Sequence, residues 1–195
     1  MAYSLPLAVV IAGPNGAGKT TAAPRLLRGA LAVSEFVNAD TIAQGLSAFR
    51  PEQAAVAAGR IMLQRLHALA HKRQSFAFET TLASRSFAPW LQGLRMRGYR
   101  VHLEFLSLPS AEMALARVRD RVRLGGHDVL APVVRRRYAR GLHNFFFGYR
   151  DVVDAWQLFD NSDSGDYRLI ASGKSDAPPA IIDNPGWSNL LEQAR

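Results

Sequence analysis

The residues best suited to chemistry are the eight from Gly13 to Thr20, which read Gly-Pro-Asn-Gly-Ala-Gly-Lys-Thr. Glycines let such a loop take backbone conformations that side chains forbid, so its N–H groups can point inward at phosphate oxygens. An apolar stretch, Leu5–Ala12, precedes the loop, and a helical stretch over about 19–27 follows it and adds the positive end of a helix. This order predicts a P-loop that binds the phosphates of a nucleoside triphosphate.

Two residues at the end of this loop have predictable tasks. Lys19 reaches the β- and γ-phosphates, and Thr20 supplies a hydroxyl ligand to Mg²⁺. We therefore expect Mg²⁺ and ATP to bind here, with GTP as the alternative nucleotide. The predicted nucleotide-binding residues are Gly13, Pro14, Asn15, Gly16, Ala17, Gly18, Lys19, Thr20 and Thr21.

Two acidic residues come at the ends of short apolar stretches. Asp40 ends the segment 36–40, and Glu79 follows residues 75–78. The carboxyl ends of parallel strands meet at one edge of a sheet, so both acids are expected beside the loop. One acid could orient Mg²⁺ and its waters, and the other could take a proton from a substrate hydroxyl. The alternative for each acid is that it only caps the helix that follows it.

An arginine-rich segment, residues 117–140, forms the third candidate feature. Arg117 and Arg121 would share one face of a helix, and Gly125-Gly126 would break that helix before a second one returns. We predict that this segment is a lid whose arginines neutralise charge on the transferred phosphoryl group and exclude water. The alternative is a solvated basic face with its arginines paired to neighbouring acids.

Helix-like and strand-like stretches alternate along the chain, which predicts an α/β protein with the three-layer P-loop NTPase fold. The central sheet should be mainly parallel with about five strands. A kinase-like domain is expected over residues 1–175, and the tail 176–195, with a last helical turn near 187–193, should belong to it. Strands are predicted at 5–12, 36–38, 75–78, 99–107, 157–159 and 167–171, and helices at about 19–27, 51–73, 84–97, 110–124 and 132–155.

Composition limits the classes of partner and location. The net charge is +8, which suits nucleic acid, a membrane surface or an anionic small substrate. Because the arginines gather in the lid, we favour the small substrate and do not expect nucleic acid. The chain has no cysteine, which is compatible with the cytoplasm, the location that we predict. The apolar stretch 5–12 is too short to span a membrane, and no basic region precedes it, so we expect no signal peptide and no membrane association.

Four motifs in order resemble the zeta toxin-like P-loop kinases: Gly13–Thr20, residues 36–40, residues 78–81 and residues 125–129. The resemblance covers Leu5 to about Ala171. It implies an ATP-dependent small-molecule kinase that acts on an alcohol group. Well-known members phosphorylate a sugar hydroxyl of UDP-N-acetylglucosamine, and relatives phosphorylate other nucleotide-linked substrates. The partners so implied are ATP, a small-molecule acceptor such as a UDP-sugar, and an antitoxin protein.

The resemblance also assigns roles to residues. Asp40 matches the catalytic base, and Glu79 matches an acid that helps to hold the substrate. The loop after the arginine helix is shorter here than in the larger toxins, and His127 falls near the place of their second lid arginine. The predicted catalytic residues are Asp40, Lys19, Arg121 and Arg117, and the predicted substrate-binding residues are Glu79, Thr80, Thr81, His127, Arg136 and Arg137.

Two other classes of protein use a similar loop. Transporter-type ATPases also carry Gly-Pro-Asn-Gly-Ala-Gly-Lys-Thr-Thr, but they need an L-S-G-G-Q-type signature and a hydrophobic strand that ends in Asp-Glu, and this sequence has neither. A nucleic-acid-associated NTPase or polynucleotide kinase is the other alternative, prompted by the charge of +8. Its affinity for RNA or DNA should fall steeply with salt.

Overall fold

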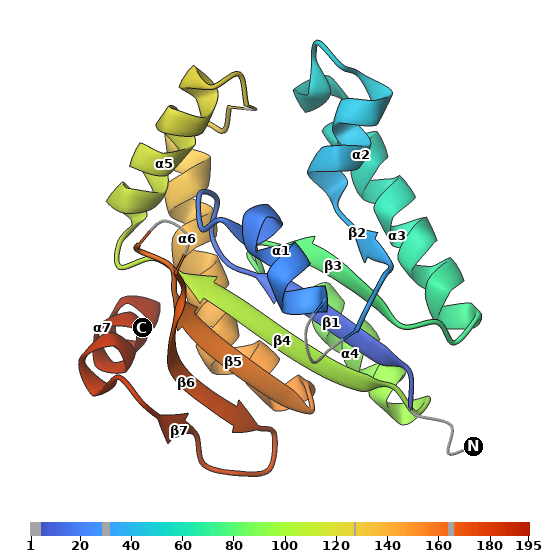
Figure 1. The fold of residues 1–195 in the computed structure, drawn as a ribbon, viewed down its shortest axis with the longest axis vertical. Helices are drawn as coiled ribbons and strands as arrows, with labels where there is room; N and C mark the ends of the chain where they lie inside the picture. The colour runs from blue at the N-terminus through green and yellow to red at the C-terminus, as the bar shows by residue number, and fades with distance from the viewer. Residues whose placement is uncertain (1–4, 29–31, 127, 164–165) are drawn as a thin grey trace.

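A seven-stranded sheet runs through the computed structural model, which describes residues 5–28, 32–126, 128–163 and 166–195 (Figure 1). The strand order is β2-β3-β1-β4-β5-β6-β7. The pairings from β2 to β5 are parallel, and β6 and β7 add antiparallel to that edge. The strands are β1 (Leu7–Ala12), β2 (Phe36–Val37), β3 (Phe76–Thr80), β4 (Arg100–Ser107), β5 (Ala155–Asp160), β6 (Arg168–Lys174) and β7 (Ala180–Ile181).

This sheet confirms the predicted α/β class and the mainly parallel order. Its described strands number seven rather than about five. The strand that the sequence did not indicate is β7, which has two residues and pairs Ala180 and Ile181 with β6. A two-residue strand is too short to show an alternation of apolar and polar residues. Its conformation depends on the neighbouring strand that supplies its hydrogen bonds.

Helices lie on both faces of the sheet, as the three-layer prediction required. In Figure 1, α1 lies in front of β1 and β3, and α4 and α6 lie behind the sheet. The predicted helix 51–73 divides into a 3-10 turn, Pro51–Ala54, and α3, and a separate helix α2 precedes it. The α-helices are α1 (Lys19–Arg28), α2 (Ala39–Leu46), α3 (Ala55–His71), α4 (Phe87–Met96), α5 (Ala111–Arg123), α6 (Ala131–Asn144) and α7 (Asn184–Ala194).

Three helix ends have a clear local cause. Ser110 is the N-cap of α5, because its hydroxyl accepts a hydrogen bond from the N–H of Met113. Gly98 follows the end of α4 with a positive φ of 80°, the conformation that closes many helices. The tail forms a full helix, α7, rather than a single turn, because the Asp183 side chain caps it and Leu190 and Ala194 are buried.

The core lies between the sheet and these helices. Residues 8–12 of β1 are fully buried, as expected for a central parallel strand with helices on both faces. The aromatic cluster after α6 packs inward, with Phe145, Phe146 and Tyr149 buried, so its role is packing. Within the described residues, every helix is too short or too polar to cross a bilayer.

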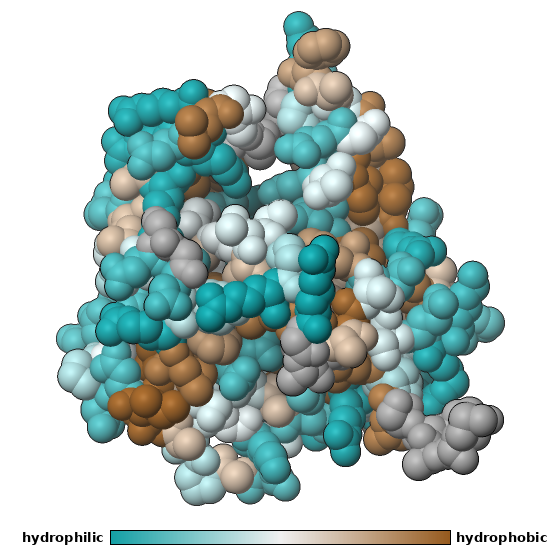
Figure 2. Space-filling view, in the orientation of Figure 1, coloured by the Kyte–Doolittle hydropathy of each residue, from teal (hydrophilic) through white to brown (hydrophobic). Residues whose placement is uncertain are grey.

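Two helix pairs rise beyond the carboxyl ends of the strands. One pair is α2 with α3, and the other is α5 with α6 (Figure 1). Figure 2 shows a hollow between the two pairs at the top of the molecule. The P-loop, between β1 and α1, lies at the base of this hollow, where ligands of open α/β sheets bind.

One acidic residue lies inside the sheet, away from the P-loop. Glu104 of β4 is only 4% exposed, between Ile11 of β1 and Gln157 of β5. Its Oε2 atom has no hydrogen-bond partner among the described residues. Burial therefore raises the pKa of Glu104 to about 7, and the folded protein holds this proton more tightly than the unfolded chain does.

We predict that Glu104 makes the stability of the fold depend on pH. Its favourable contribution is complete below the unfolded pKa of 4.5 and is lost as the pH rises through about 7. Glu104→Gln removes the titration. The variant should match the native protein at acid pH and exceed its free energy of unfolding by on the order of 3 kcal/mol above neutrality. Urea unfolding over a pH series measures this, and a difference that does not change with pH would contradict it.

Candidate active site

The loop before α1 is shaped by contacts with β4 and with the loop after β5. Gly13 has a φ of 139°, and a Cβ atom there would lie 2.1 Å from the carbonyl oxygen of Leu106. Gly18 has a φ of 72°, and a Cβ atom there would lie 2.7 Å from Nδ2 of Asn161. Both positions therefore require glycine, for backbone conformation and for space. Two of the glycines in the predicted P-loop are thus needed to form the loop.

Lys19 is buried at the base of this loop. Its Nζ atom donates a hydrogen bond to the carbonyl oxygen of Pro14 at 2.9 Å and lies 3.5 Å from Oε1 of Glu79. Burial lowers the pKa of Lys19, and the nearby carboxylates of Glu79 and Asp40 oppose that shift. These carboxylates therefore act as the counter-charges of a buried ammonium group.

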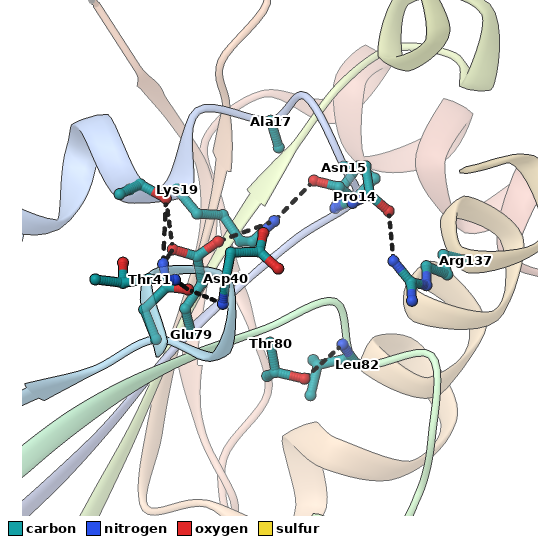
Figure 3. Close-up of polar contacts among 12 residues, drawn as sticks. Pro14, Asn15, Ala17, Lys19, Asp40, Thr41, Glu79, Thr80, Leu82 and Arg137 are labelled. Carbon is teal, nitrogen blue, oxygen red and sulfur yellow. Dashed lines mark hydrogen bonds and ion pairs between the residues drawn. The ribbon is translucent and has the colours of Figure 1, made fainter. Parts of the chain in front are cut away.

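Glu79 ties the P-loop to the neighbouring strands. Its Oε2 atom accepts hydrogen bonds from the hydroxyl of Thr20 and from Nδ2 of Asn38, both at 2.8 Å. Nδ2 of Asn38 also donates to the Thr20 hydroxyl at 3.4 Å. Figure 3 shows Glu79 close to Lys19 and Asp40. The acid thus lies at the predicted Mg²⁺ ligand, so the structure relates it to the metal end of the site more directly than to an acceptor.

Asn38 also positions Asp40. Its Oδ1 atom accepts hydrogen bonds from the N–H groups of Asp40 at 2.7 Å and Thr41 at 3.4 Å, so Asn38 is the N-cap of α2. The capping alternative considered for Asp40 therefore belongs to Asn38. Asp40 lies in the first turn of α2, and its carboxylate is left for another task.

Two cavities meet at these residues. The first, of about 570 Å³, is lined by the P-loop and the start of α1, by Arg117 and Arg121 of α5, and by Asn161 and Tyr167. The second, of about 450 Å³, is bounded by α2, α3, the end of β3 and α6. Four residues line both cavities: Asn15, Lys19, Asp40 and Glu79. A nucleotide in the first cavity would thus present its terminal phosphate to a molecule in the second.

The predicted lid arginines lie in different places. Arg121 lines the first cavity, close enough to Lys19 to help lower the pKa of that lysine. Arg117 donates hydrogen bonds to the backbone carbonyls of Asn161, at 2.6 Å, and Ser162. Arg137 of α6 lines the second cavity and donates to Oδ1 of Asn15 at 3.5 Å.

The remaining predicted site residues also lie in different places relative to the two cavities. Arg136 is exposed on α6 and lines neither cavity in the described part of the chain. Thr80 and Thr81 line the second cavity, and the Thr80 hydroxyl accepts a hydrogen bond from the N–H of Leu82. Thr21 lines the first cavity. His127 lies outside the described residues.

Two asparagines were not predicted as site residues. Asn38 belongs to the segment 36–40, and its position after a strand and before Asp40 is a helix-capping signal that could have revealed it. Asn161 donates from Nδ2 to the carbonyl oxygen of Ala17 at 2.7 Å across 144 residues of sequence, and no local signal marks it. Both hold the P-loop region in place.

The side chains present fit a magnesium ion. Mg²⁺ prefers oxygen ligands and is held in P-loop proteins by a few side chains together with waters and phosphate oxygens. Thr20 supplies a hydroxyl, and Glu79 supplies a carboxylate 2.8 Å from it. No group of three or more histidine, cysteine or acidic residues that could hold a metal by itself occurs among the described residues. This donor set suits an ion that arrives with a nucleotide.

The fold and this loop are of the P-loop kinase-like class. A family model described as an AAA domain matches residues 9–145, which is more than half of the chain. The chain therefore belongs to this AAA domain family. An uncharacterized protein of Haemophilus influenzae is 31% identical over 133 residues, which make up 67% of this chain and 91% of that protein.

Solved structures show a similar fold at low sequence identity. A chain of the AvrRxo1-ORF1:AvrRxo1-ORF2 complex, crystallised with sulphate ions, is 17% identical with a TM-score of 0.79. The match covers 99% of this chain and 66% of that one, so this chain spans just under two thirds of its length. The same complex has been solved with ATP. The PezAT toxin–antitoxin system of Streptococcus pneumoniae matches at 15% identity and a TM-score of 0.65, over 99% of this chain and 89% of that one.

Gly18→Ala is predicted to weaken nucleotide binding without unfolding the protein. The new methyl group would strain a residue with a φ of 72° and displace the Asn161 amide that holds Ala17. We expect the Kd for ATP to rise by roughly tenfold or more, since about 1.4 kcal/mol is enough for that. Titration calorimetry with ATP and Mg²⁺ measures it. Gly93→Ala in α4, where a Cβ atom meets nothing within 4 Å, is the control. Equal affinities in the two variants would contradict the prediction.

Proposed function

We propose that this protein is an ATP-dependent kinase that transfers the γ-phosphate to a hydroxyl group of a small molecule. The observation that carries the proposal is the junction of the two cavities. Asp40, Lys19 and Glu79 line both of them, so phosphate-binding and acid groups lie where a donor and an acceptor would meet. A binding protein or a simple ATPase would not need a second cavity at this point.

Each side chain has a task in such a transfer. The N–H groups of the P-loop and Lys19 hold the phosphates, and Arg121 adds positive charge on the opposite side of the first cavity. Asp40 accepts the proton of the acceptor hydroxyl as its oxygen attacks the γ-phosphorus and the bond to the ADP oxygen breaks. Thr20 and Glu79 would hold Mg²⁺, which neutralises charge on the phosphates when it is bound.

The activity fits the zeta toxin type, with a nucleotide sugar or a related nucleotide-linked metabolite as acceptor. The ordered motifs from Gly13 to residue 129 support this, and so does the shared fold with PezAT. The ATP-bound structure of the AvrRxo1-ORF1:-ORF2 complex supports ATP as the donor. An antitoxin protein, as in the PezAT system, would be the partner of such an enzyme, and the cytoplasm its location.

We predict that Asp40→Asn abolishes phosphotransfer and leaves nucleotide binding intact. Removing a general base costs about 10²–10⁴-fold in rate, while the amide keeps the size of the side chain and its place in α2. Labelled ATP is incubated with nucleotide sugars, nucleosides and a cell metabolite extract, and the labelled product is measured. Asp176→Asn, at an exposed acid that lines neither cavity, is the control for charge. Undiminished turnover in Asp40→Asn would remove Asp40 from the mechanism.

A polynucleotide kinase is the second candidate, favoured by the net charge of +8. Its acceptor would be the terminal hydroxyl of RNA or DNA. We expect no labelled phosphate on oligonucleotides with a free 5′-hydroxyl, because the second cavity holds about 450 Å³ and the arginines gather around the phosphate site. Labelled oligonucleotides, together with a filter-binding affinity that falls steeply with salt, would establish the second candidate instead.

A further inference from the structure

A glycine in the middle of α3 has no structural explanation. Gly59 lies well inside the helix Ala55–His71, and glycine destabilises a helix interior relative to alanine. No close packing requires it, because a Cβ atom at Gly59 would meet nothing within 4 Å. Gly59 does line the second cavity. The missing side chain therefore leaves space on the side where the acceptor would bind.

The residues around Gly59 form one face of α3 toward the same cavity. Val56, Gly59, Arg60 and Leu63 follow the spacing of three or four residues that places side chains on one side of a helix, and all of them line the cavity. Val56 is 70% exposed and Leu63 is 44% exposed, although both are apolar. We call these four residues the α3 face. It offers apolar surface on either side of one cationic group.

Arg60 is the positive group of this cavity that the phosphate site does not use. Lys19 is held by Pro14 and Glu79, and Arg137 is hydrogen-bonded to Asn15 of the P-loop. Arg60 is exposed, and no described residue forms a hydrogen bond or ion pair with it. An arginine on a cavity wall without such a partner can bind a carboxylate or a phosphate group with both arms of its guanidinium.

We propose that the α3 face selects the acceptor, with Arg60 binding an anionic group and Gly59 leaving space for the body of the molecule. The acceptor would then be a hydroxyl-bearing anion, with a carboxylate or a phosphate group, such as the diphosphate of a nucleotide sugar, on Arg60 and the hydroxyl turned toward Asp40. The inference rests on the proposed kinase function and adds the chemical class of its substrate and two specificity-determining residues.

The first test separates acceptors by charge. A cell metabolite extract is passed over an anion exchanger, and the bound and unbound fractions are each incubated with labelled ATP and the native protein. We expect a labelled product only from the bound fraction. Treating that fraction beforehand with a phosphomonoesterase, which is then removed, destroys a terminal phosphate group and leaves a carboxylate or the internal diphosphate of a nucleotide sugar intact.

Each outcome of this test supports or contradicts the α3 inference or the kinase proposal. A product from the unbound fraction that requires Asp40 would overturn the α3 inference and leave the kinase proposal standing. No product from either fraction, with ATP bound normally, would count against both. A product from the bound fraction supports the inference and supplies the acceptor for the variants.

The second test changes Arg60. Arg60→Met keeps an unbranched side chain and removes the charge. We expect the KM for the acidic acceptor to rise roughly tenfold or more, as for the loss of a charge-assisted pair, while the KM for ATP and kcat stay within about threefold. Lys72→Met, which removes a positive charge beyond the end of the same helix and outside both cavities, is the control. An unchanged acceptor KM in Arg60→Met would overturn the role of Arg60.

The third test fills the space at Gly59. Gly59→Ala should raise the Tm, because alanine is the better helix former and its methyl group meets no atom. Gly59→Leu should extend into the cavity and raise the acceptor KM roughly tenfold or more while the Kd for ATP stays the same. Gly93→Leu in α4, where a Cβ atom also meets nothing, controls for a leucine on a helix. Normal acceptor kinetics in Gly59→Leu would show that the acceptor does not approach α3.

Discussion

The carboxylate of Glu79 is the contact on which the rest of the site depends. It stands at the end of a central strand and holds, through two oxygens, the ammonium group of Lys19, the hydroxyl of Thr20 and the amide of Asn38. Those three groups belong to the P-loop, the first helix and the start of α2. A single carboxylate, on a side chain that is 11% exposed, therefore fixes the relative positions of three segments, and it compensates the charge of a lysine that is 6% exposed.

The two helix pairs beside this carboxylate differ in the side chains that they present to the cavities. The pair α5–α6 is rich in arginine and faces the P-loop, with Arg121 on one cavity and Arg137 on the other. The pair α2–α3 presents Asp40 and the α3 face, which is apolar apart from Arg60. The β1–α1 loop lies between them, at the base of the hollow (Figures 1 and 2). Positive charge would thus surround a bound donor, while the second cavity combines Asp40, Arg60, Arg137 and apolar surface.

The parts of the fold that the sequence predicts are those set by local spacing. The P-loop, the central strands and the position of Glu79 at a strand end follow from motifs of a few residues. The parts missed depend on distant partners. Asn161 binds Ala17 across 144 residues, and β7 exists only because β6 lies beside it. The α3 face was missed for a related reason, since the pattern indicates a helix without showing which side faces a cavity.

The hydrogen bonds of Arg117 have a consequence for movement. Its guanidinium donates hydrogen bonds to two carbonyls in the loop after β5. The side-chain amide of Asn161 in that loop donates to the carbonyl oxygen of Ala17 in the P-loop. These hydrogen bonds attach the first half of α5 to the wall of the first cavity. Arg121 lies one turn beyond Arg117 on the same helix, so this attachment keeps Arg121 beside the first cavity. In that position Arg121 would meet the phosphates of a bound nucleotide with little displacement. The end of the segment near Leu124 would be the part that moves to let nucleotide exchange.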